Sequence, residues 1–221
     1  MSEKKHDTVI TSFLLVRHAE STANAGAYFG SQSDAQLSEK GRLQVDALVK
    51  ALRGVPIDAV YSSDLSRARD TVAPLALERR LPLVTTPRLR EREMGTLTGL
   101  TFEEAKARHP QLWRDLLART PDAAPPGGES HIALYERVSA ILDELAKKHP
   151  GRVVLIGSHG VAINHMLRHL MGIRDPHLPL WFSVDNASVS RIDLHRRQDV
   201  EAPRLTYANR VAPPDGTPLP F

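Results

Sequence analysis

Short runs of valine, isoleucine and leucine alternate along the chain with longer segments in which apolar residues recur every three or four positions. The short runs predict buried strands, and the longer segments predict helices that pack through one face. This alternation favours an α/β fold, a three-layer sandwich with a mostly parallel central sheet flanked by helices. We expect strands at residues 12–16, 59–62, 83–85 and 153–157, with two more that begin at residues 186 and 204.

Capping residues and an apolar face locate the first long helix. It is expected over residues 38–54, with Ser38 as its N-cap and Gly54 at its end. Five apolar residues are expected to face the core from this helix: Leu43, Val45, Leu48, Val49 and Leu52.

Two more helix starts are marked by polar residues. A helix that begins at Asp64 contains Pro74, which we expect to kink it or to divide it in two. Thr101 and Glu104 have the spacing of a capping box, which predicts a short helix after them.

The second half of the chain contains a loop and two further helices. Residues 120–128, TPDAAPPGG, form a loop by composition. A long amphipathic helix is expected over residues 130–151, and residues 159–172 predict a turn and a helix directly after a strand.

The same pattern divides the chain into three parts. Residues 1–8 are polar and are expected to form a flexible lead-in. Residues 9–210 carry all the expected strands and helices and are expected to form a single domain. Residues 211–221 are rich in proline and are expected to form an irregular tail.

Composition and charge narrow the classes of function. The formal net charge is only +3, with signs mixed along the chain, so we expect no nucleic-acid partner. There is no cysteine, which excludes disulfides, thiolate metal sites and a cysteine nucleophile. The apolar run near the N-terminus is too short for a signal peptide or a membrane span, so we expect a cytoplasmic protein with no membrane partner.

Histidine and arginine residues follow three of the expected strands. Arg17 and His18 end the first strand, and His159 follows the strand at residues 153–157. Ligands bind at the carboxyl ends of parallel strands, so these side chains are expected to meet. Arg67 lies one turn into the helix that follows the strand at residues 59–62. Its side chain would point to the same edge of the sheet and could bind a phosphate. Taken singly, each has an ordinary explanation, a charged strand end for His18 and a solvated helix face for Arg67.

Five short motifs occur in one order along the chain: RHAESTAN, SSDLSRARDT, LREREMGTLTG, GGES and GSHG. In this order they resemble the motifs of the histidine phosphatase superfamily, in the branch that includes cofactor-dependent phosphoglycerate mutases and many small phosphatases. The acid-phosphatase branch has a further arginine shortly after the histidine, where this chain has Glu20 and Ser21. The resemblance implies a phosphoglycerate mutase-like fold and identifies residues 9–210 as a histidine phosphatase domain.

The resemblance also implies roles for individual residues. His18 resembles the nucleophile that becomes phosphohistidine. A neutral imidazole is needed for this attack, and neighbouring guanidinium groups lower its pKa. The remaining residues that the resemblance places at the catalytic or substrate-binding site are Arg17, Asn24, Arg67, Glu91, His159 and Gly160.

Two carboxylates compete for the role of acid and base. The family pattern puts this residue four positions before a glycine, which selects Glu91. Glu93 is the alternative, two positions before Gly95, where it could instead hold a neighbouring arginine. We favour Glu91, because its position in the motif agrees with the proton transfers that the chemistry needs.

Three other motifs have simpler explanations than a second active site. His165 and His169 have a metal-ligand spacing, but without a HExxH pattern a partly exposed helix face is the better interpretation. Ser158 lies in GSHG, which is not the GxSxG of a serine hydrolase. Glu129 and Ser130 could form only a loop and an N-cap, although the resemblance places one of them near the site.

These observations favour a metal-independent phosphomonoester hydrolase that acts through a phosphohistidine on a small phosphorylated metabolite, with no cofactor. The first alternative is a cofactor-dependent phosphoglycerate mutase, but such mutases usually have a longer basic insertion before the GGES motif. The second is a non-catalytic phosphate-binding or regulatory module, in which we would expect the site residues to be eroded. The sequence leaves open which substrate is used and whether the protein forms a homo-oligomer.

Overall fold

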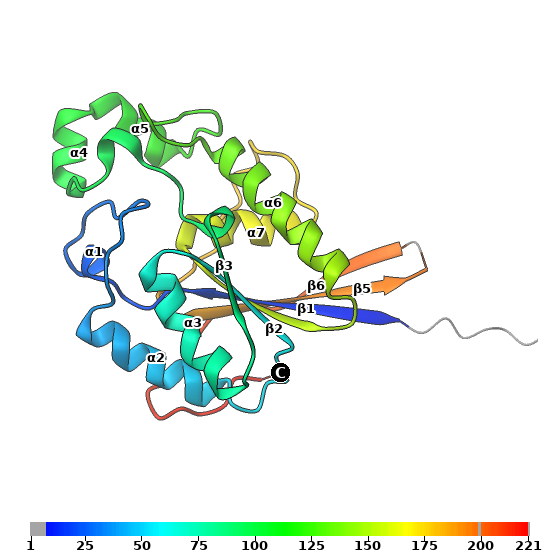
Figure 1. Ribbon diagram of the computed structural model, residues 1–221. Helices are drawn as coiled ribbons and strands as arrows, with labels where there is room; N and C mark the ends of the chain where they lie inside the picture. The colour runs from blue at the N-terminus through cyan, green and yellow to red at the C-terminus, as the bar shows by residue number, and fades with distance from the viewer. Residues whose placement is uncertain (1–7, 199, 221) are drawn as a thin grey trace, which may run out of the picture.

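The computed structural model describes residues 8–198 and 200–220. Its six strands are β1 (Val9–Arg17), β2 (Ala59–Ser63), β3 (Leu83–Thr86), β4 (Val153–Ser158), β5 (Ser188–Arg197) and β6 (Val200–Val211). They form one sheet in the order β3-β2-β4-β1-β5-β6 (Figure 1). The first four strands pair in parallel, whereas β5 and β6 join antiparallel at one edge. The sheet is therefore mixed and mostly parallel.

Helices cover both faces of this sheet. They are α1 (Thr22–Ala25), α2 (Glu39–Ala51), α3 (Ser66–Glu78), α4 (Phe102–Arg108), α5 (Pro110–Ala118), α6 (His131–Lys148) and α7 (Gly160–Leu170), with single 3-10 turns at Pro87–Leu89 and Gly95–Leu97. Figure 1 shows α2 and α3 on one side of the sheet and α6 and α7 on the other. The expected three-layer α/β sandwich is confirmed.

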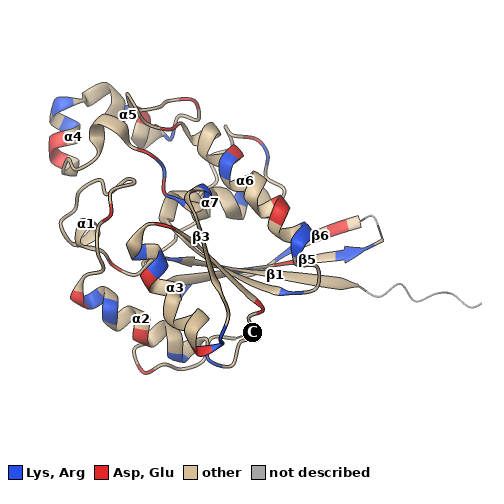
Figure 2. Ribbon diagram, viewed as in Figure 1, with Lys and Arg blue, Asp and Glu red and all other residues tan. Residues whose placement is uncertain are grey.

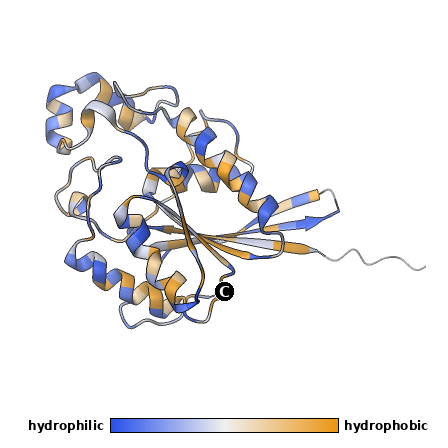
Figure 3. Ribbon diagram, in the orientation of Figure 1, coloured by the Kyte–Doolittle hydropathy of each residue, from blue (hydrophilic) through white to orange (hydrophobic). Residues whose placement is uncertain are grey.

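The central strand β1 explains why the sheet needs both helix layers. Phe13 and Leu15 pack into the core beneath α6 and α7, while Leu14 and Val16 pack into the core beneath α2 and α3. All four side chains are buried, since alternate residues of a strand face opposite sides. Figure 2 shows charged residues on the helices, and Figure 3 shows hydrophobic residues along the central strands.

The chain between β3 and α6 forms a cap beyond the sheet. Helices α4 and α5 lie at the upper left of Figure 1, away from the strands. They have a small core of their own, in which Met94, Leu97 and Ala105 are buried. Both hydrogen bonds of the predicted capping box at Thr101 are formed. The sequence interpretation missed α5, although Pro110 at its first turn is a standard helix-start signal.

Most expected elements are confirmed, and three details are wrong. Leu43 does not face the core, because 67% of its surface is exposed. Helix α2 ends at Ala51, before Gly54. Helix α3 runs through Pro74 as one element, so of the two expected effects, a kink or a division, the division is absent.

The two chain ends can be compared with expectation only in part. Of the expected lead-in, residues 1–7 lie outside the described residues. The tail after β6 is irregular, as expected, but it packs on the body: Leu219 is buried and its N–H donates to the carbonyl of Ala51. None of the helices formed by the described residues is long and apolar enough to span a membrane.

We predict that Gly41→Ala destabilises the protein. A Cβ at this position would lie 2.1 Å from the carbonyl oxygen of Glu20, in the backbone just after His18. Alanine favours a helix by about 1 kcal/mol over glycine, but this clash should reverse the sign and lower the free energy of unfolding by about 1–3 kcal/mol. Denaturant unfolding measures the change.

Gly54→Ala is the matched control. A Cβ there would meet no atom within 4 Å, so the free energy of unfolding should stay within about 0.5 kcal/mol of the wild-type value. Equal effects of the two substitutions would contradict the packing argument.

Candidate active site

Three strand ends meet at one edge of the sheet, as the sequence predicted. Arg17 is the last residue of β1 and is in register with Ser158, the last residue of β4. His18 and His159 are the next residues along the chain, and their ring centroids are 5.1 Å apart. Ser63, at the end of β2, lies 2.9 Å from Nε2 of His159. The site is thus built from the ends of three adjacent strands.

His18 is buried and held in a defined orientation. Its Nδ1 lies 2.8 Å from the carbonyl oxygen of Ala19, which can only accept a hydrogen bond, so the proton is on Nδ1. The pKa of His18 is well below its ordinary value of 6.5, first because of burial and then because of the charges on Arg67 and Arg17. The ring is therefore neutral, and Nε2 has a free electron pair.

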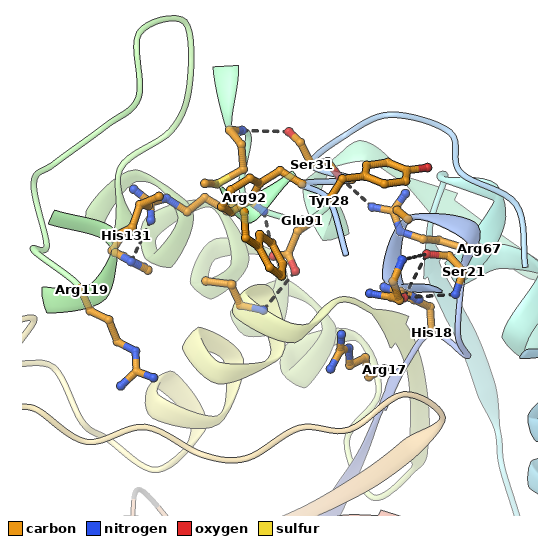
Figure 4. Close-up of a pocket in the computed structure, with 18 of the residues that line it drawn as sticks. Arg17, His18, Ser21, Tyr28, Ser31, Arg67, Glu91, Arg92, Arg119 and His131 are labelled. Atoms are coloured by element: carbon orange, nitrogen blue, oxygen red, sulfur yellow. Dashed lines mark hydrogen bonds between the residues drawn. The ribbon is translucent and has the colours of Figure 1, made fainter. Parts of the chain in front are cut away.

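Arg17 and Arg67 place two positive charges beside this ring (Figure 4). Nη1 of Arg17 donates to the carbonyl of Val184, at 2.5 Å, while its buried Nε has no partner. Arg67 is 3% exposed, and its two terminal nitrogens donate to the carbonyls of Ser31 and Ser33, each at 2.6 Å. Burial lowers the pKa of both guanidinium groups. Among the described residues neither arginine forms an ion pair.

His159 and Gly160 lie at the start of α7, where His159 is the N-cap and Gly160 the first helical residue. His159 is completely buried and does not line the cavity described below. Its pKa is well below the ordinary value, because of burial and then Arg67, and its Nδ1 has no partner. A Cβ on Gly160 would lie 3.4–3.8 Å from the Arg17 side chain, an ordinary contact distance, so the Arg17 side chain lies close to the start of α7.

Glu91 and Glu93 have different surroundings. The carboxylate of Glu91 accepts backbone N–H groups of Arg92, Val161 and Ala162, the last two in the first turn of α7. This places it over the helix start and in the cavity.

Glu93 does not line the cavity, and its carboxylate supports a loop. Its Oε1 accepts hydrogen bonds from Ser31, Gly95 and Thr98. Ser31 in turn holds Arg67 through its carbonyl. Glu93 therefore orders the loop around Ser31, and it acts on Arg67 only through Ser31.

Asn24 lies at the exposed rim. Its Oδ1 accepts hydrogen bonds from both the backbone and the hydroxyl of Ser21, and from the side-chain amide of Asn186. Since the oxygen is occupied, the Asn24 amide nitrogen is the group left to face the cavity.

A cavity of about 440 Å³ connects these residues to the cap. At one end it is lined by Arg17, His18, Arg67, Glu91 and Asn24. The other lining residues were not among the individual site residues expected from the sequence: Ser21, Ala23, Tyr28, Phe29, Gly30, Ser31, Arg92, Met94, Phe102, Trp113, Leu116, Leu117, Arg119, His131, Val161 and Trp181. The aromatic and basic residues of the segment before GGES were the available signal.

A buried imidazole pair lies beside the cavity. His131 Nδ1 is 3.0 Å from His165 Nε2, and Arg92 donates to His131 Nε2 at 2.9 Å. Burial, followed by neighbouring arginines, lowers the pKa of each histidine to about 3. The expected partly exposed face for His165 and His169 is therefore wrong: both are buried, and His169 bonds Asp143.

Glu129 and Ser130 lie outside the cavity. Glu129 pairs with Arg137 through both carboxylate oxygens, and Ser130 is the N-cap of α6. Across residues 8–198 and 200–220, no group of three or more His, Cys, Asp or Glu side chains is arranged to hold a metal ion.

Comparison with known families agrees with this geometry. The family model described as histidine phosphatase superfamily (branch 1) matches residues 13–203. The chain belongs to the histidine phosphatase superfamily. The match extends over nearly the whole sheet and includes the three strand ends that carry the site.

Relatives within the histidine phosphatase superfamily have both phosphatase and mutase names. Phosphoserine phosphatase 1 of Hydrogenobacter thermophilus is 32% identical over 86% of this chain and 90% of its own length. A probable phosphoglycerate mutase, GpmB, of Yersinia enterocolitica is 34% identical over 81% of this chain and 83% of its own. The solved mycobacterial glucosyl-3-phosphoglycerate phosphatase in complex with VO3 is 29% identical, covers 90% of this chain and 98% of its own, and has a TM-score of 0.79.

We predict that acid destabilises this histidine phosphatase through the buried imidazole pair. A pKa of about 3 in the folded state, against 6.5 unfolded, means that only the unfolded chain gains these protons between those values. Stability is full above pH 6.5 and falls as the pH drops toward 3, by about 2 kcal/mol for one such histidine at pH 5. Urea unfolding at pH 7.5 and pH 5 measures the loss.

The double variant His131→Gln, His165→Gln is the control. The other groups titrate alike in both proteins, so the variant should lose less stability than the wild type between the two pH values. An equal loss would mean that this pair does not carry the effect.

Proposed function

We propose that this protein is a metal-independent phosphomonoester hydrolase that acts on small phosphorylated metabolites through a phosphohistidine at His18. One observation carries the proposal. Two guanidinium groups, largely removed from water and without an ion pair among the described residues, flank a neutral imidazole with a free Nε2. A cationic pocket of this kind is costly unless an anion completes it, and a phosphate group fits its charge and donors.

The first step transfers the phosphoryl group to His18. The phosphate oxygens bind Arg17 and Arg67, which supply the positive charge that a metal would otherwise provide. The Nε2 electron pair of His18 forms a bond to phosphorus while the bond from phosphorus to the leaving oxygen breaks. Glu91 is the one acidic side chain among the described residues that line the cavity. It enters this step as the carboxylic acid, passes its proton to that oxygen and becomes the carboxylate.

The second step returns the enzyme to its starting state. A water molecule attacks the phosphorus, the bond to Nε2 breaks, and Glu91 accepts the proton that water loses. The products are the alcohol, inorganic phosphate and neutral His18. The hydrogen bond from Nδ1 to the Ala19 carbonyl keeps the ring oriented through both steps, since this proton never leaves.

Hydrolysis is favoured over a mutase reaction by the far end of the cavity. A mutase must bind a second phosphate there. Arg92 is already committed to Glu129, His131 and Ala123, and the low pKa of His131 keeps that ring neutral. Arg119 is then the one cation left among the described residues at that end, which is little for a doubly charged group.

The first prediction from this proposal concerns His18. Wild-type protein should release inorganic phosphate from phosphate monoesters without a bisphosphoglycerate primer and in the presence of EDTA. It should also form a phosphoenzyme that is lost in acid and survives alkali. His18→Ala should lower kcat by at least about 1,000-fold and abolish the phosphoenzyme.

Full activity in His18→Ala would refute the phosphohistidine mechanism. Strict dependence on the primer would favour the mutase, and phosphate binding without turnover would favour a non-catalytic module.

The second prediction separates the two glutamates. Glu91→Gln should lower kcat by about 10²–10⁴-fold, because an amide cannot transfer the proton. Glu93→Gln keeps an acceptor oxygen for Ser31 and Gly95, so kcat should stay within about threefold of wild type. Steady-state kinetics on one phosphate monoester compares them, and the reverse order would assign the role to Glu93.

A further inference from the structure

Arg119 is a cation without a counter-charge at the cap end of the cavity. It follows the last residue of α5 and lines the same cavity as His18. Within the described part of the chain its side chain forms no hydrogen bond or ion pair, and Asp122, which lines an adjoining cavity with it, is not paired to it. Its φ of 52° is left-handed, where glycine is the usual residue, yet the chain has a long cationic side chain there.

The guanidinium group of Arg119 rests on an aromatic support. Its central carbon lies 4.6 Å from the ring centroid of Trp181. Trp181 also contacts His131 and His165, whose ring centroids each lie 5.6 Å from that of Trp181 with the rings close to perpendicular. Because both imidazoles are neutral, they shape this support without adding charge. Figure 4 shows Arg119 and His131 at the opposite side of the view from Arg67 and His18.

One part of the cavity wall, on the cap side, is apolar. Phe29 and Phe102 pack edge-to-face with ring centroids 4.9 Å apart, and Trp113 continues this surface at 6.5 Å from Phe102. Leu116 and Leu117 add the α5 side of the cavity. A leaving group that reaches from His18 toward Arg119 would therefore contact aromatic and aliphatic side chains along its length.

We infer that Arg119, supported by Trp181, is a specificity-determining subsite for phosphate monoesters whose leaving group is an apolar chain or ring that ends in an acidic group. The inference rests on the proposed hydrolase function and names its substrate class. The phosphate binds Arg17 and Arg67, the apolar body lies along the cap, and the terminal carboxylate binds Arg119. The carboxylate then forms a charge-assisted pair with the cation at that end of the cavity, an arginine that is exposed in the structure.

The test uses a graded substrate series. Phosphate monoesters of straight-chain ω-hydroxy acids, from three to eight carbons, are each paired with the neutral primary amide. The two members of a pair have the same length and similar leaving-group chemistry, so the ratio of their kcat/KM values reports the terminal charge. Inorganic phosphate release gives the rates. The acid should be favoured by at least about tenfold, with a maximum at the chain length that spans the cavity.

Arg114, within α5, and Arg119, which follows its last residue, give a matched pair of variants. Arg119→Gln should bring the acid-to-amide ratio close to one while kcat/KM for the amides changes by less than about twofold. Arg114→Gln removes the same charge from an exposed position that does not line the cavity, and its ratio should equal that of wild type. Arg119→Lys should keep part of the preference.

The outcomes separate this inference from the proposed function. Turnover of the series with no acid preference, or an equal loss of preference in Arg114→Gln and Arg119→Gln, overturns the subsite and leaves the hydrolase intact. If Arg119→Gln lowers acids and amides alike, Arg119 serves the cap's structure and the inference also fails. Absence of phosphate release from every member, and from any other phosphate monoester, refutes the hydrolase itself.

Discussion

The interaction on which the rest of the structure depends is that between two guanidinium groups and one neutral imidazole. Arg67 and Arg17 are oriented by the carbonyls of Ser31, Ser33 and Val184, which are dipoles and carry no net charge. Their field, added to burial, lowers the pKa of His18 and keeps its ring neutral. In the proposed reaction the phosphate group completes this pocket, and the neutral ring is the form of His18 that the proposed attack needs.

Holding such a site requires loops that are fixed by the helices behind them. The hydroxyl of Thr71 in α3 donates to the carbonyl of Arg67 and accepts from the N–H of Ala19, so one side chain sets arginine and histidine together. The close approach of Gly41 in α2 to Glu20 limits the same loop from the other side. The position of the reacting atoms is therefore a property of the packed helix layer, not of the strand end alone.

The two ends of the cavity are formed by different parts of the chain. The residues proposed to transfer the phosphoryl group come from the sheet edge and from the loop that carries Glu91, whereas the cap and Trp181 form the other end of the cavity. The small core beneath α4 and α5 is separate from the two main cores. Substitutions in the cap can thus change which leaving group fits while the phosphate end stays in place.

The sequence by itself determined the sheet, the helix layers and the meeting of Arg17, His18, Arg67 and His159, because strand and helix periodicity are local and parallel strands bring their ends to one edge. It also favoured Glu91 over Glu93, through position in a motif. Local pattern could not place Leu43, which has the right spacing but the wrong face, nor show that α3 continues through Pro74. The imidazole pair of His131 and His165 and the contact of Arg119 with Trp181 join distant segments. Only the tertiary structure decided those, because each depends on how the cap and α7 fold back over the same cavity.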